Sequence, residues 1–346
     1  MLIYGANGYT GALIARRAAA KGVAAVLAGS DGQAVAALAG ELGLTHRVFA
    51  LDDTAAIGVA LRGARAVLNC AGPFSRTASR LVDACLRERI HYLDITGEVG
   101  VLEELAARDA AARAAEITLL PGAGFDVVPS DCLAAHVAGR LPSATHLALA
   151  FAAGTSMSRG TALTSIENAH AGGLIRRDGK LVSVSSGWRT RRIDFGNGPR
   201  KAITIPWGDV ATAYHTTGIG NVEVYIALPL AGRVAMRLGR WLGPLLGSPA
   251  VKRRLEAGVR RRPAGPSAEE RARRGSQLWA EARDDGGTSV RSRLRTPEAY
   301  ELTSWTALDL AERAARGELP VGFQTPARAC GADYILQFSG VVREDV

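Results

Sequence analysis

The sequence has little of what builds metal sites, disulfide frameworks or membrane spans. Its four cysteines, Cys70, Cys85, Cys132 and Cys330, lie far apart and form no CxxC or Cys/His pattern, so neither a metal site nor a disulfide framework is indicated. No run of about 20 apolar residues occurs, so we expect no spanning helix, and we expect no signal peptide, because Met1 leads directly into an apolar strand pattern. Scattered cysteines in apolar segments suit a reducing compartment, and we expect a cytoplasmic protein.

Acidic residues are scarce in only one part of the chain. The sequence has 42 basic and 33 acidic residues, a net charge of +9. The segment from Leu230 to Arg262 holds nine basic residues and one acid, Glu256, a net +8, so the remainder is close to neutral. Because the charge is local and comes with neither interleaved aromatics nor a known motif, we expect no nucleic-acid partner.

Glycine, in contrast, is plentiful, and its most informative cluster opens the chain. Gly5, Gly8 and Gly11 follow the apolar run Leu2–Tyr4 and precede a helical pattern over Ala12–Lys21. This order can cradle a pyrophosphate, because glycine lets the backbone come close and the helix start presents N–H groups. An ordinary strand-to-helix turn is the alternative. The predicted dinucleotide-binding residues of the turn are Gly5, Asn7, Gly8, Tyr9, Thr10 and Gly11.

Strands and helices alternate up to residue 125. Further strands are predicted at Ala24–Ala28, Arg47–Leu51, Ala66–Cys70, Ile90–Asp94 and Thr118–Leu120, and helices at Gln33–Leu42, Thr77–Glu88 and Leu102–Ala115. Such alternation with short connections predicts an α/β Rossmann domain over residues 1–125, with a doubly wound parallel sheet.

Hairpin signals replace this alternation in the second half. Asp178-Gly179 separates Leu174–Arg177 from Lys180–Ser185, and similar turns follow at 196–199 and 284–287. They predict a second α+β domain over residues 126–320, built on a mostly antiparallel sheet. Residues 321–346, with a last strand at Tyr334–Phe338, are expected to pack back onto the body.

The loops after the strands are the candidate ligand contacts, because ligands of an open parallel sheet lie at the carboxyl ends of its strands. After the second strand, Ser30 could bind either a ribose hydroxyl or a 2′-phosphate, whereas Asp31 would repel a phosphate if it faced the site. Asp52 is placed to meet the adenine edge. After the fourth strand, a run of mostly small residues would let the backbone approach the nicotinamide ribose: Asn69, Ala71, Gly72, Pro73 and Phe74. For each residue, ordinary turn chemistry is the alternative.

Acidic and hydroxyl side chains follow the last two predicted strands. Asp94 and Glu98 come after the fifth strand, and Asp126 and Ser130 after the sixth, which places all four near the nicotinamide end. For Asp94 and Ser130 a helix N-cap is the alternative. Tyr92 is expected to face the core.

Motifs in several of these loops match one family in order along nearly the whole chain. They are Tyr4–Gly11, Leu68–Phe74, His91–Glu98, Gly122–Leu133, Ser158–Thr161, Ile205–Asp209, Thr216–Ile219, Gly265–Ser267 and Thr325–Arg328. Through them the chain resembles the saccharopine dehydrogenase-like oxidoreductases, in the branch that includes the trans-acting enoyl reductases. The resemblance implies a Rossmann domain, a second α+β domain and nicotinamide-dependent reduction, usually with NADP, NAD being the other candidate.

The sequence departs from the family pattern at two places. It reads Ala28-Gly29-Ser30 where the family usually has Ala-Gly-Arg, which removes the expected partner of a 2′-phosphate. The family also usually has several more residues before the first strand. We expect either a late start or a trimmed sheet edge here.

The reduction implied by the resemblance needs a group that stabilises charge on the acceptor. Hydride addition to an enoyl thioester would leave an enolate, and a C=N bond is the other candidate acceptor. The candidate catalytic residues are Arg159, with Ser158 and Thr161 beside it, Tyr214 or His215 as proton source, and Asp126. A structural ion pair is the alternative for Arg159. The alternative for the whole chain is a cofactor-binding, membrane- or carrier-associated protein with little turnover.

The basic segment contains a predicted amphipathic helix at Leu230–Leu246. Arg233, Arg237 and Arg240 recur on one face, and apolar residues including Val234 recur on another. The pattern fits an ordinary packed helix, a membrane-surface contact through residues 230–262, or a docking face for an acidic carrier protein. We therefore expect a small-molecule or acyl substrate, free or carrier-bound, peripheral membrane contact as one option, and a homodimer.

Overall fold

A computed structural model describes residues 1–153, 157–168, 172–234, 236 and 248–346. The chain divides into two compact units, residues 1–128 with 300–329 and residues 129–299 with 330–346. The division differs from the expected domains, because residues 300–329 belong with the first unit. The reason is physical: Gly322 and Phe323 in this stretch extend the first unit's sheet.

The first unit is built on a seven-stranded parallel sheet, which confirms the predicted Rossmann-type fold. Its order is β15-β6-β5-β4-β1-β2-β3. The central strands β1 and β4 are buried along their whole length, as expected of parallel strands covered on both faces. The strands are β1 (Leu2–Tyr4), β2 (Val26–Gly29), β3 (Thr45–Val48), β4 (Ala66–Asn69), β5 (His91–Asp94), β6 (Thr118–Leu120) and β15 (Gly322–Phe323).

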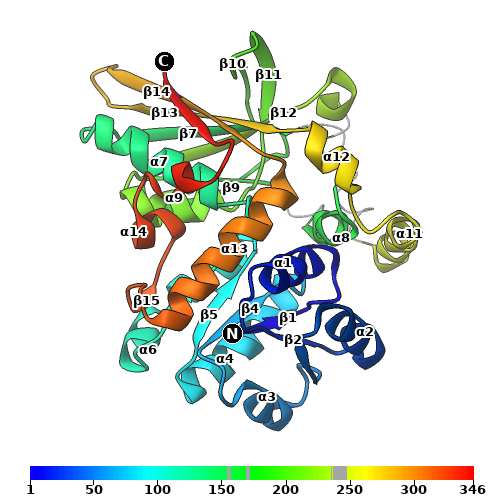
Figure 1. Cartoon of the computed structure of the whole chain (residues 1–346). Helices are drawn as coiled ribbons and strands as arrows, with labels where there is room; N and C mark the ends of the chain where they lie inside the picture. The colour runs from blue at the N-terminus through cyan, green and yellow to red at the C-terminus, as the bar shows by residue number, and fades with distance from the viewer. Residues whose placement is uncertain (154–156, 169–171, 235, 237–247) are drawn as a thin grey trace. The chain divides into compact units, whose positions relative to one another are not determined.

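Helices connect these strands (Figure 1). They are α1 (Tyr9–Ala20), α2 (Gly32–Leu42), α3 (Thr54–Leu61), α4 (Phe74–Glu88), α5 (Val99–Ala106), α6 (Asp109–Ala114), α13 (Ala299–Arg316) and α14 (Pro326–Cys330). The single helix predicted at Leu102–Ala115 is wrong, because the chain turns at Arg108. The Arg108 guanidinium there donates to Asp83, Ser79 and Glu104, which holds the break against α4 and α5.

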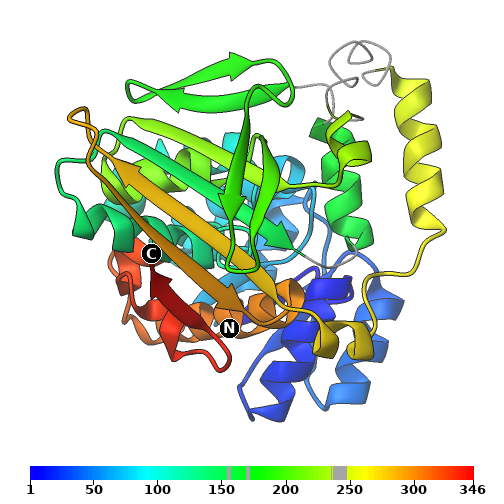
Figure 2. The ribbon, with the colours of Figure 1, turned by 90° about the horizontal axis from the view of Figure 1, so that it is seen from above.

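The second unit is built on a nine-stranded sheet that is mostly antiparallel, as predicted. Only β7 and β12 pair in parallel among its described strands. Three of the hairpins expected from turn residues are present, namely β8–β9, β10–β11 and β13–β14 (Figure 2). The strands are β7 (His146–Ala153), β8 (Gly173–Arg177), β9 (Lys180–Val184), β10 (Thr190–Asp194), β11 (Pro199–Thr204), β12 (Asn221–Ala227), β13 (Ser276–Arg283), β14 (Ser289–Thr296) and β16 (Val342–Asp345).

The last predicted strand, Tyr334–Phe338, is wrong, and a 3-10 helix, η1 (Tyr334–Gln337), takes its place. The rings of Tyr334 and Phe338 meet edge to face at 5.4 Å, with Phe338 at the extended residue that ends this helix. The last strand is β16 instead. The other described helices of this unit are α7 (Val128–Arg140), α8 (Arg159–Asn168), α9 (Asp209–Thr217), α11 (Pro249–Arg260) and α12 (Ala268–Arg273).

The predicted basic helix is only partly described. Residues 230–234 are helical, and the Arg233 guanidinium donates to the Leu228 carbonyl at 2.6 Å. Arg237 and Arg240 lie outside the described residues. Within the described part of the chain, no helix is long and apolar enough to cross a membrane, and no cluster of His, Cys, Asp and Glu could hold a metal ion.

Candidate functional site

The glycine turn at the end of β1 brings two loops of the first unit into close contact. Gly5 has φ +75°, and a Cβ there would lie 2.8 Å from the backbone nitrogen of Ala71. A Cβ at Gly11 would lie 2.3 Å from the Gly5 carbonyl oxygen. Glycine is therefore required at both positions. Gly5 lets the loop that follows β4 come close, and Gly11 lets α1 pack against the turn.

Helix α1 begins at Tyr9, earlier than the predicted start at Ala12. Tyr9, Thr10 and Gly11 therefore form its first turn, at the end of the helix that carries partial positive charge and attracts an anion. Gly8 precedes the helix and brings no side chain to cap it. Asn7 and Gly8 are exposed at this turn, so the predicted pyrophosphate cradle is open to solvent.

A buried hydrogen-bond network holds the loop after β4. The Asn69 carbonyl Oδ1 accepts from the Ala71 N–H at 3.0 Å, and its Nδ2 donates to Thr77 Oγ1 at 3.1 Å and Tyr92 Oη at 3.2 Å. Thr77 Oγ1 donates to the Ala71 carbonyl at 2.7 Å. The Asn69 side-chain amide thus makes its hydrogen bonds to other groups of the protein. One of these bonds positions Ala71 against the glycine turn. Tyr92 faces the core, as predicted.

The network continues to Asp94, which is fully buried. Its Oδ2 accepts from the Tyr92 hydroxyl at 2.9 Å, and its Oδ1 accepts from the N–H groups of Thr96 and Gly122, each at 3.0 Å. Asp94 is therefore no helix cap but ties the loops after β5 and β6 together. Burial raises the pKa of Asp94 to about 6, although these hydrogen bonds act in the opposite direction.

Glu98 has a role that sequence reasoning missed. Its carboxylate accepts from the N–H groups of Phe74 at 2.8 Å and Ser75 at 3.1 Å. It therefore caps α4, which explains why the helix begins at Phe74 and not at the predicted Thr77. Pro73 immediately precedes the helix, so the small-residue loop of residues 69–73 ends where this cap begins.

Helix α13 supports the loop after β6, a second feature that sequence reasoning missed. Thr303 Oγ1 accepts from the Phe125 N–H at 2.9 Å, and Thr306 Oγ1 donates to the Ala123 carbonyl at 2.8 Å. The two threonines stand three residues apart on one helix face. That spacing indicates that both threonines share one helix face, but nothing in the sequence indicates that this face contacts the loop after β6.

Asp126, a predicted catalytic residue, belongs to this supported loop. A Cβ at Gly97 would lie 3.1 Å from Asp126 Oδ2, so the carboxylate rests against the loop after β5. Burial raises the pKa of Asp126 to about 6. A carboxyl that titrates near neutrality at the carboxyl end of the sheet is suited to proton transfer.

The residues predicted for the adenosine half lie at the ends of β2 and β3. Ser30 and Asp52 are exposed. The Asp31 carboxylate accepts from the Ala34 N–H at 3.0 Å and caps α2. Burial of the phenol, and in second place the negative charge of Asp52, raise the pKa of Tyr4.

In the second unit, Ser158, Arg159 and Thr161 form the start of α8. The Ser158 hydroxyl is buried and accepts from the Thr161 N–H at 3.2 Å, as a helix cap does. The Arg159 side chain is exposed, and its guanidinium lies 3.4 Å from the Arg260 carbonyl at the end of α11. Both contacts hold the start of α8 in place.

Tyr214, on α9, packs against the β8–β9 hairpin. The guanidinium of buried Arg176 lies over its ring, 4.3 Å from the centroid. That guanidinium also donates to the Gly179 carbonyl at 2.8 Å and the Val210 carbonyl at 2.9 Å. The neighbouring Thr216 hydroxyl donates to Asp131 at 2.5 Å, which joins α9 to α7.

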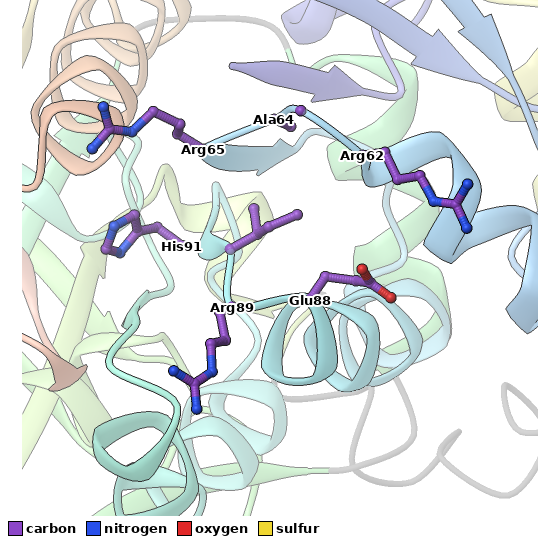
Figure 3. A pocket seen from close by; sticks show the side chains of 8 residues that line it. Arg62, Ala64, Arg65, Glu88, Arg89 and His91 are labelled. Atoms are coloured by element: carbon purple, nitrogen blue, oxygen red, sulfur yellow. The ribbon is translucent and has the colours of Figure 1, made fainter.

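A pocket of about 350 Å³ opens at the other end of the first unit's sheet (Figure 3). Its lining comes from the segments that precede β4 and β5, and includes Arg62, Arg65, Glu88, Arg89 and His91. These segments lie at the amino ends of the strands. The pocket is therefore on the opposite edge of the sheet from the glycine turn and is not the predicted dinucleotide site.

Comparison with known proteins agrees with this architecture. Residues 1–120 match the family model of the saccharopine dehydrogenase NADP binding domain. This stretch of the first unit therefore resembles the cofactor-binding domain of the saccharopine dehydrogenases. The match confirms the predicted cofactor class, a nicotinamide dinucleotide, which is NADP for the family.

Curated relatives match over part of their length. A trans-acting enoyl reductase of Mycobacterium ulcerans (strain Agy99) is 30% identical over 147 residues, covering 40% of this chain and 35% of that protein. A trans-acting enoyl reductase of Mycobacterium leprae (strain TN) is 32% identical over 141 residues, covering 38% and 33%. The match thus spans about a third of the length of these relatives.

Two solved structures share the fold over the whole chain. Saccharopine dehydrogenase (L-Glu forming) from Saccharomyces cerevisiae has a TM-score of 0.62 at 12% identity and covers 100% of this chain and 99% of that chain. Homospermidine synthase from Legionella pneumophila, solved in complex with NAD, has a TM-score of 0.65 at 12% identity and covers 100% and 91%. At this identity the likeness concerns the fold.

Proposed function

We propose that the chain is an NAD(P)H-dependent oxidoreductase that reduces a C=C bond of an enoyl thioester-like substrate or a C=N bond. The observation that carries the proposal is the contact between Gly5 and Ala71, which joins the glycine turn to the loop after β4 at the carboxyl end of the sheet. Both loops are needed to hold the two halves of one dinucleotide. The enoyl reductase relatives favour the C=C bond.

Each part of the site has a proposed task toward the cofactor. The turn residues hold the pyrophosphate through backbone N–H groups, Ser30 and Asp52 contact the adenosine half, and residues 71–74 line the nicotinamide half. Asn69 keeps Ala71 in place through its own hydrogen bonds. The bound cofactor supplies a hydride, and the protein supplies orientation and electrostatics.

Three side chains are proposed to act on the substrate. Asp126, with its pKa raised to about 6, holds or releases a proton near the end of the sheet. Tyr214 and Arg159, each held by the structural contacts described above, are proposed to donate a proton and to stabilise negative charge on the acceptor.

Partners follow from the charge of the second unit. The described part of the segment 230–262 includes Arg253, Arg254 and Arg260, all exposed. Such a surface suits an acidic carrier protein that delivers an acyl substrate, and membrane-surface contact and a homodimer are further proposals. Neutralising Arg253 and Arg254 is expected to weaken, in a salt-dependent way, the binding of an acyl carrier protein and leave turnover of a free thioester unchanged.

The test of the function is oxidation of NADH or NADPH in the presence of a panel of enoyl thioesters and imines. Turnover with one class of acceptor supports the proposal and names the bond. Saturable binding of nucleotide without oxidation by any acceptor would instead favour a cofactor-binding protein with little turnover. A variant Tyr214→Phe is expected to lower kcat with little change in cofactor affinity, because it removes only the hydroxyl.

A further inference from the structure

The loops at the ends of β2 and β3 are acidic and contain no basic residue. They read Gly29-Ser-Asp-Gly-Gln-Ala34 and Phe49-Ala-Leu-Asp-Asp-Thr54. Because the two strands pair in parallel, with Gly29 opposite Val48, both loops lie at the same edge of the sheet. In a dinucleotide-binding sheet this edge receives the adenosine ribose.

Asp31 is fixed at this edge by the helix that follows it. Its Oδ1 accepts from the Ala34 N–H at 3.0 Å and caps α2. The helix start therefore holds an exposed carboxylate beside Ser30. A carboxylate at the end of the second strand accepts a hydrogen bond from a ribose 2′-hydroxyl, whereas it repels a 2′-phosphate.

The next strand adds two further carboxylates. The Asp53 side chain accepts from the N–H groups of Ala55 at 3.0 Å and Ala56 at 2.9 Å, and so caps α3. Asp52 is its neighbour in sequence and lies close enough to Tyr4 to affect that phenol. A 2′-phosphate at this edge would face Asp31 with two more negative side chains nearby.

The arginine of β3, which is close in sequence to Asp52 and Asp53, does not compensate the negative charge of these loops. Arg47, on β3, directs its guanidinium to the carbonyls of Ala60 and Arg62 at the end of α3. The guanidinium is thus engaged in closing the β3–α3 connection.

We infer that the site prefers NAD(H) to NADP(H), and that Asp31 is the residue that sets the preference. The inference rests on the proposed function, because it takes the dinucleotide to lie at the glycine turn. It departs from the cofactor for which the domain family is named, and the departure lies in the residues around the ribose and not in the pyrophosphate cradle.

The experiment compares equilibrium binding of NADH and NADPH to the full chain, by calorimetry or by quenching of tryptophan fluorescence, without any substrate. We expect NADH to bind about 10- to 100-fold tighter, the effect of close like charges near a protein surface. NADPH binding as tightly as NADH or tighter would overturn the preference and leave the proposed function standing. Binding of neither would overturn the proposed function itself.

Two variants test whether Asp31 sets the preference for NADH over NADPH. Asp31→Asn keeps a good helix cap but removes the charge, and is expected to bring the two dissociation constants within about threefold, mainly by tightening NADPH. Ser30→Arg supplies a phosphate partner and is expected to act in the same direction. If Asp31→Asn leaves the ratio of the two constants unchanged, Asp31 does not set the preference.

A matched control separates local charge from net charge. Glu116→Gln makes the same change in charge on the amino side of the same sheet, where Glu116 is 79% exposed and pairs only loosely with Arg89 at 3.8 Å. It is expected to leave the NADH to NADPH ratio as in the wild type. An equal shift in this control would show that long-range charge is responsible and would contradict a role for Asp31.

Discussion

The glycine turn of the first unit and the start of α8 in the second unit were both predicted to be functional, and they are held in different ways. At the turn, the backbone itself is the proposed binding surface, and the approach of Gly11 to the Gly5 carbonyl leaves no room for a side chain. At α8, the predicted groups are side chains, and Ser158 is already engaged in capping its helix. A backbone site is specified by the absence of side chains, whereas a side-chain site depends on what else those chains contact.

Of the changes that test this difference between the turn and α8, the largest loss of NADH affinity is expected at Gly11. A Cβ there would lie 2.3 Å from a backbone oxygen, so Gly11→Ala is expected to displace α1 and weaken NADH binding by about 100-fold or more. Gly40→Ala is the control, because a Cβ at that helical position meets nothing within 4 Å. The control should keep its affinity and gain about 0.5–1 kcal/mol in stability. Equal affinities for the two variants would refute the close-contact argument.

The next effect concerns the buried network behind the turn. The folded-state pKa of Asp94 is raised from 3.8 to about 6 by burial, so its protonated form stabilises the fold below the unfolded pKa, and this contribution is lost as the pH rises through about 6. Asp94→Asn cannot ionise. As the pH rises from about 4 to about 8, the wild type should therefore lose up to about 3 kcal/mol of unfolding free energy that Asp94→Asn does not lose.

Urea unfolding of both proteins across this range measures the difference. Asp126 also has a pKa of about 6, and it remains in both proteins, so its contribution cancels. Parallel curves for wild type and Asp94→Asn would show that Asp94 does not titrate in this range.

A smaller effect is expected at the cap of α4. Glu98→Ala removes the acceptor for the N–H groups of Phe74 and Ser75, which should cost about 1–2 kcal/mol in stability. Glu98→Gln retains one acceptor oxygen and should lose less. Thermal unfolding compares the three proteins, and an unchanged melting temperature in Glu98→Ala would speak against the cap.

The smallest effect on stability is expected at Arg159. Its side chain is exposed, and its guanidinium makes a long contact of 3.4 Å with the Arg260 carbonyl, so Arg159→Ala should change stability by no more than about 0.5 kcal/mol. Any loss of kcat then reports on chemistry and not on folding. Full retention of kcat and KM would remove Arg159 from the proposed catalytic residues.

The sequence was sufficient to predict the parts of the fold that local patterns specify. Alternating strands and helices gave the parallel sheet, and turn residues gave the hairpins. The glycine spacing predicts the turn, because the close contact that excludes a side chain at Gly11 is made with Gly5, only a few residues away in the sequence. The strand pattern also predicts that Asp94 lies at the carboxyl edge of the sheet, because Asp94 ends β5.

Long-range contacts were beyond the same reasoning. Phe125 and Thr303 are separated by 178 residues, and no local pattern links them, so α13 was assigned to the wrong domain. Glu98 capping α4 also depends on two loops meeting in space. At Tyr334–Phe338 the apolar run predicts a strand, but the chain forms a 3-10 helix over Tyr334–Gln337 and becomes extended at Phe338.

The central claim, that a dinucleotide lies at the carboxyl end of the first unit's sheet, is tested most directly by hydrogen–deuterium exchange with and without saturating NADH. The glycine turn and the loop after β4 should both gain protection, at residues 5–11 and 69–74, while the arginine-lined pocket of Figure 3 should not. Protection of residues 62–65 and 88–91 in place of the turn, or no protection anywhere, would contradict it.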